Sequence, residues 1–102
     1  MKELKEIIRD IAAELECAEG YAKEAVKHKH EYPELASVYA QIAKDDMGHA
    51  DALHKQALAM IEEKKREGAE APASMKAIWE YEHERQIEDA ANVRRLLDMY
   101  RI

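Results

Sequence analysis

Apolar residues recur every three or four positions along three long segments of this chain, and this spacing restricts it to helical architectures. The first segment covers residues 2–29, the second residues 33–66 and the third residues 74–101. In the first, the repeating positions are Leu4, Ile7, Ile8, Ile11, Leu15, Ala18, Ala22, Ala25 and Val26. We therefore predict an all-α protein of three long helices.

The breaks between the segments are short and contain residues that end or begin helices. Pro33 suits the first turn of a new helix, and Gly68 followed by Pro72 suits the end of the second helix and a solvated loop. Ser74 is a predicted N-cap of the third helix. Because short connections join neighbouring antiparallel helices, the chain is expected to form an antiparallel bundle.

The size of the chain points to one domain, residues 1–102, with a core small enough to favour a homodimer or a larger even homo-oligomer. The net charge of -6, with both signs mixed along each helix, argues against nucleic acid as a partner. No apolar run is long enough to span a membrane, and no signal-peptide core is evident, so we expect a cytoplasmic protein. The single cysteine, Cys17, excludes an internal disulfide and is interpreted as a bystander.

An acidic residue interrupts the apolar stripe of the second segment. With about 100° per residue, the apolar positions of this segment average close to the direction of Asp46, and His49 lies about 60° to one side. Residues three apart leave a helix on the same face. We therefore predict that Asp46 and His49 both point towards the interior.

Two other acid and histidine pairs have the same spacing but a different direction. Asp51/His54 and Glu80/His83 point away from the stripes of their helices. The histidines interpreted as surface residues are His28, His30, His54 and His83.

Glu14 of the first segment lies at the level of this predicted pair. Counted from the turn before Pro33, Glu14 is about as far back as His49 is forward, so antiparallel packing brings them together. Two carboxylates and an imidazole suit iron, manganese or zinc. A buried hydrogen-bonded pair, or a polar device that fixes helix register, remains an alternative, and Glu14 could be an ordinary edge glutamate.

The third segment also has a polar interval in its stripe. Glu82, Gln86 and Asp89 fall within about 40° of its apolar centre. Glu82 and Asp89 are candidate metal ligands, or partners of arginines across an oligomer interface. Gln86 is interpreted as structural.

The pattern resembles a known family. Glu14-Leu15, Tyr21 seven residues after Glu14, and the run Asp46-Met47-Gly48-His49-Ala50-Asp51 are similar to the first helix pair of ferritin-like di-metal carboxylate proteins such as bacterioferritins and rubrerythrins. The resemblance covers about the first 60 residues. It implies that Glu14 is the first-helix ligand, Asp46 the bridging carboxylate and His49 the terminal imidazole.

The chain departs from this family in ways that imply a shared site. Asp46 replaces the usual glutamate, the second and third helices are joined by a short loop rather than a long crossover, and a second inward acid-x-x-His is missing. One chain thus holds half a site, and a homodimer would complete it, as in the short ferritins associated with encapsulins. The implied function is oxidation of Fe(II) by oxygen or peroxide at a di-iron centre. The alternatives are a non-catalytic helical interaction module and a purely structural metal.

Overall fold

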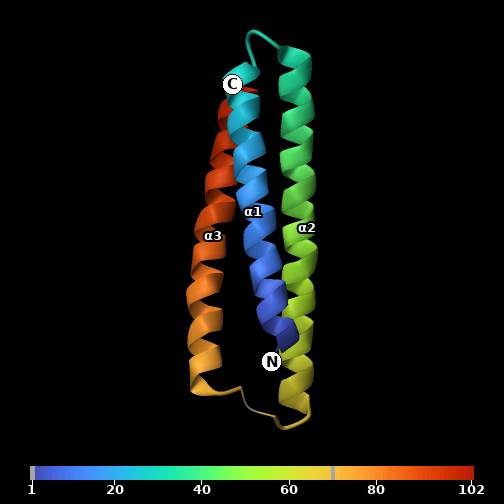
Figure 1. Cartoon of the computed structure of the whole chain (residues 1–102), viewed down its shortest axis with the longest axis vertical. Coiled ribbons are helices and arrows are strands. Elements are labelled where there is room, and N and C mark those ends of the chain that lie inside the picture. The colour runs from blue at the N-terminus through green and yellow to red at the C-terminus, as the bar shows by residue number, and fades with distance from the viewer. Residues whose placement is uncertain (1, 70) are drawn as a thin grey trace.

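The computed structural model describes residues 2–69 and 71–102; Met1 and Glu70, the latter in the predicted loop, lie outside the described residues. Its helices are α1 (Lys2–His28), α2 (Pro33–Arg66) and α3 (Ala73–Arg101). They lie side by side in a rod 56 Å long, and the chain runs along α1, returns along α2 and turns again into α3 (Figure 1). The predicted all-α class is confirmed, and each helix boundary agrees with its prediction to within one residue.

The ends of α2 form where proline and glycine predict them. Pro33 occupies the first turn, where its missing N–H has no helical partner to lose. At the other end Gly68 adopts a positive φ of 78°, which only glycine adopts at little cost. The N–H groups of Gly68 and Ala69 donate to the carbonyls of Lys65 and Lys64, each at 3.0 Å. These bonds satisfy the last carbonyls of the helix and turn the chain towards α3.

The start of α3 differs from the prediction. Ser74 was expected to be the N-cap, but the cap position is Pro72 and no side chain caps this helix. The Pro72 carbonyl accepts hydrogen bonds from the N–H groups of Met75 and Lys76, at 2.9 and 3.1 Å. Because the helix begins at Ala73, Ser74 lies inside it, and the predicted N-cap is wrong.

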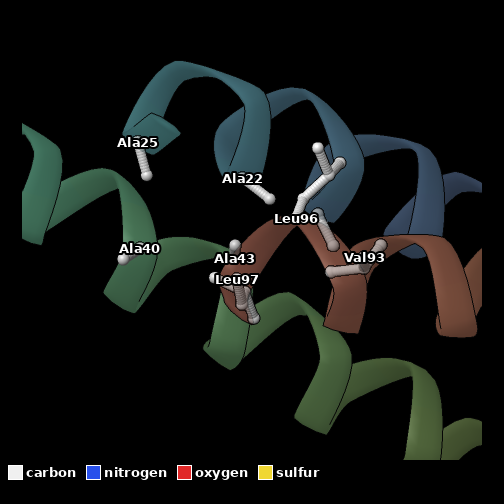
Figure 2. Packing of buried hydrophobic residues seen from close by; sticks show 8 residues of the cluster. Ala22, Ala25, Ala40, Ala43, Val93, Leu96 and Leu97 are labelled. Carbon is white, nitrogen blue, oxygen red and sulfur yellow. The ribbon is translucent and has the colours of Figure 1, made fainter. Parts of the chain in front are cut away.

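The core is organised around α1, which packs against both α2 and α3, while α2 and α3 touch each other least. The largest cluster lies near the α1–α2 turn and comprises Ala18, Ala22, Ala25, Ala40, Ala43, Val93, Leu96 and Leu97. Figure 2 shows that α1 and α2 contribute alanines to it, and α3 contributes the larger side chains. Small residues let the α1 and α2 backbones approach closely, and the valine and leucines fill the remaining space.

Two smaller clusters continue the core towards the other end of the rod. The first consists of Ile11, Leu15 and Ala50, and the second of Leu4, Ile8, Ala57 and Met75. In all three clusters the contribution of α2 is alanine alone. The larger apolar residues of α2 are therefore left at the margins of the core.

The helices are long without being apolar. At about 1.5 Å per residue, each exceeds the thickness of a bilayer core. Charged residues recur along all three, however, and within the two described ranges no helix has the apolar stretch needed to cross a membrane.

Among the described residues, Gln86 is the one polar residue buried in the core. Its Nε2 donates to the Ile8 carbonyl at 3.4 Å, a long hydrogen bond to an oxygen that lies within α1. Because so weak a bond contributes little, we expect Gln86→Leu to change the free energy of unfolding by less than about 1 kcal/mol. Urea denaturation monitored by circular dichroism would measure this. A loss above about 2 kcal/mol would contradict it and make the amide a structural requirement.

Candidate metal centre

Glu14 on α1 and Asp46 and His49 on α2 come together near the middle of the rod. One ligand atom from each lies within 4.8 Å of those of the other two. Among residues 2–69 and 71–102, no other group of three or more histidine, cysteine, aspartate or glutamate side chains meets this condition. The regular rise of two paired helices explains the convergence, because equal distances from the connecting turn give equal levels.

The distances within this group show convergence without tight pairing. His49 Nδ1 lies 3.5 Å from Glu14 Oε2 and 3.8 Å from Asp46 Oδ1. Both separations exceed the range of about 2.7–3.2 Å for a good N–H···O hydrogen bond. The imidazole is thus near both carboxylates but makes a good hydrogen bond to neither.

Exposure of the three side chains increases across the group. Asp46 is 16% exposed, Glu14 is 31% exposed and His49 is 62% exposed. The inward direction predicted for His49 is therefore wrong. The imidazole lies at the edge of α2, because its offset of about 60° from the stripe carries it beyond the contact with α1. The group is consequently open to solvent on the His49 side.

Electrostatics in the group disfavour two bare carboxylates. Burial raises the pKa of Asp46, the neighbouring Glu14 raises it further, and His49 opposes the shift. A carboxylate held away from water beside another carboxylate needs a compensating positive charge. A bound cation would provide it.

Two tyrosines flank the group on the side nearer the α1–α2 turn. Tyr21 is seven residues from Glu14 and Tyr39 is seven residues from Asp46, so they share the same helix faces. Their rings stack with centroids 5.9 Å apart, and the His28 ring stacks on Tyr39 at 6.1 Å. The rings form an aromatic cluster about two helical turns from the carboxylates, towards the α1–α2 turn.

Further apolar residues line the same side of the α1–α2 pair without being fully buried. By helical spacing, this stripe contains Ile7, Tyr21, Leu35, Tyr39, Ile42, Leu53 and Met60. Each is half-buried or exposed in the single chain. The carboxylates thus lie in the middle of an apolar stripe that the chain itself leaves partly uncovered.

Glu82 and Asp89, the other candidate ligands, are not brought to this group. Both are half-buried on α3, and α3 packs against another side of α1. Asn92 Nδ2 of α3 donates to Glu19 Oε1 of α1 at 3.0 Å. Glu19 is five residues from Glu14 and therefore points about 140° away from it. Within one chain, the third helix supplies no ligand to the group.

The structure also corrects the interpretation of three histidines, because His28, His54 and His83 were assigned to the surface but are half-buried. His28 Nε2 lies 3.1 Å from Glu24 Oε2, and the ring centroids of His54 on α2 and His83 on α3 lie 5.0 Å apart. For His54 and His83, the only hint of a special role in the sequence is the acid three residues before each histidine. This hint was set aside because each acid–histidine pair points away from the apolar stripe of its own helix.

The chain was compared with known families, curated proteins and solved structures. No family model, no curated protein and no solved structure matches it. The resemblance to ferritin-like proteins therefore stays a prediction from the residues quoted above, and the function is argued from the geometry of the site.

Proposed function

We propose that two copies of this chain bind a pair of iron ions between them and oxidise Fe(II) with oxygen or peroxide. The observation that carries the proposal is the convergence of Glu14, Asp46 and His49 from two helices. Two carboxylates and one imidazole form a donor set suited to iron, and also to manganese or zinc. The raised pKa of Asp46 supports it, because a bound cation would compensate both the burial and the repulsion from Glu14 that raise this pKa.

A homodimer is part of the proposal because one chain offers only three ligands. A two-fold axis beside the group would bring together four carboxylates and two imidazoles, the set used by ferritin-like di-metal centres. The exposure of His49 and the partly uncovered apolar stripe around it support this arrangement. Burial of that stripe would stabilise the dimer.

Each side chain has a role in this scheme. Asp46, the least exposed of the three, would bridge the two metal positions, and Glu14 and His49 would be terminal ligands. Bound iron would supply the redox chemistry, with each Fe(II) giving one electron to the oxidant. The carboxylates would stabilise the higher charge of the ferric product.

Light scattering coupled to size exclusion, followed by anaerobic titration with Fe(II), tests the proposal. We expect a dimer or a larger even oligomer that saturates near two iron ions per dimer. Subsequent exposure to oxygen or peroxide should produce ferric absorbance faster than iron does in buffer.

Each contrary result selects a different alternative. A monomer of 11.8 kDa that binds two ions tightly would exclude the shared site. Oxidation no faster than in buffer, in protein that holds iron, would leave a structural metal. Failure to bind any metal would favour an interaction module in which a protonated His49 compensates the two acids.

A further inference from the structure

A second group of side chains joins α2 to α3, apart from the carboxylates. The ring centroids of His54 and His83 lie 5.0 Å apart, and Trp79 lies 5.9 Å from His54 and 5.5 Å from His83. Trp79 packs on the core cluster at the far end of the rod from the α1–α2 turn. The three rings form a contact between two helices that otherwise touch little.

The two imidazoles are close enough to share a metal ion, at a distance also found between packed rings. A zinc ion lies about 2.0 Å from each nitrogen ligand, so two imidazoles at tetrahedral angles have centroids about 5 Å apart. The planes of His54 and His83 are tilted by 40°, which is not the geometry of a parallel stack. His54 instead stacks on Trp79, with an angle of 11° between the rings.

The protonation state of His54 is consistent with a ligand. Burial lowers its pKa, and the nearby His83 lowers it further, against the opposing effect of Asp51. A neutral imidazole, the form that binds metals, is therefore favoured at neutral pH.

An acid precedes each histidine by three residues, Asp51 before His54 and Glu80 before His83. Asp51 and Glu80 are both exposed, and Asp51 Oδ2 lies 3.0 Å from Lys55 Nζ. Neither acid forms a group of three ligand atoms within 4.8 Å together with the two imidazoles. The histidine pair is therefore the only part of the site that the protein supplies among its described residues.

We propose that His54 and His83 bind one Zn²⁺ ion per chain and that this ion links α3 to α2, with water completing a tetrahedral set. Zinc favours imidazole with carboxylate or water and has no redox chemistry of its own. This site goes beyond the proposed iron centre and does not depend on it. Its role is structural, because it joins the least connected pair of helices.

Trp79 makes the proposal measurable, because it is the single tryptophan of the chain and contacts both histidines. Zn²⁺ would be titrated into full-length Asp46→Asn protein, in which the carboxylate group is impaired, while tryptophan fluorescence is recorded. We expect a saturable change at one Zn²⁺ per chain and a rise in Tm. His54→Gln and His83→Gln should each weaken the affinity by at least about tenfold and remove the rise in Tm. His30→Gln, at the α1–α2 turn, is the matched control and should bind as the parent does.

Two measurements keep the test decisive if a variant folds poorly. Circular dichroism of the metal-free variants reports their helix content, and NMR of the parent protein reports which of the five histidine rings Zn²⁺ shifts. We expect the signals of His54 and His83 to move together and to saturate at one equivalent. Unchanged ring signals for this pair, or wild-type affinity in either glutamine variant, would overturn the proposal.

Discussion

Asp46→Ala is expected to abolish tight iron binding while leaving the helix content intact. Asp46 is the least exposed of the three converging side chains and the proposed bridge between the two metal positions. Its removal from both copies would delete two of six ligands and leave each ion without its shared oxygen. Anaerobic Fe(II) titration would measure the binding, and circular dichroism the helix content. His49→Ala should weaken binding less completely, because the terminal imidazole lies at the exposed edge.

The same substitution separates the metal hypothesis from the alternative of a buried polar pair. Burial and the neighbouring Glu14 both raise the pKa of Asp46, so the ionised form is disfavoured in the fold and its replacement by alanine or asparagine should leave the metal-free protein as stable as before, or raise its Tm. Thermal denaturation in the presence of a chelator would show this. If Asp46→Ala instead unfolds the metal-free protein, and the unsubstituted protein carries no metal, the acid and His49 form a structural pair.

Glu14→Ala is expected to slow the oxidation of bound Fe(II) by at least about tenfold. The carboxylate of Glu14 approaches His49 from the other helix and would stabilise the ferric product as a terminal ligand. The rate would be followed by ferric absorbance after oxygen or peroxide is added to protein loaded anaerobically. The comparison requires equal iron content in both proteins, so that loss of binding is not mistaken for slow chemistry.

Cys17→Ala is the matched control for this variant. Cys17 is exposed on α1, three residues from Glu14, and is expected to leave the oxidation rate unchanged. A similar slowing in both variants would indicate a general disturbance of α1. Unchanged kinetics in Glu14→Ala would remove this residue from the ligand set.

Much of the fold was predictable because it depends on local rules. Apolar periodicity sets the three helices, and Pro33 and Gly68 set the ends of α2 through properties of their own backbones. The meeting of Glu14 with Asp46 was predictable for a related reason. Helical rise is constant, so a count of residues from the connecting turn gives the level of each side chain along the pair.

The predictions that failed concern side chains whose exposure depends on where α3 packs. The phase of a residue is measured against the stripe of its own helix, and a stripe does not say which neighbour covers its edges. His49 was expected to point inward but is exposed, because in the described part of the chain no element covers that edge of α2. His54 was expected at the surface but meets His83 from α3. The side of α1 on which α3 packs decides both outcomes, and no pattern within a single helix encodes it.

The alanines between α1 and α2 have a consequence for any ion held by these helices. Ala18 lies one turn from Glu14, and Ala43 lies one turn before Asp46; both are completely buried. At these two positions the side chains are no larger than a methyl group, so the close approach of the two backbones helps to set how far apart the carboxylates stand. The close contact of α1 with α2 therefore limits the distance between the ligands that the two helices carry. A larger residue in place of either alanine would push the helices apart and lengthen this distance without altering any ligand. The size of the ion that fits between the ligands would then change.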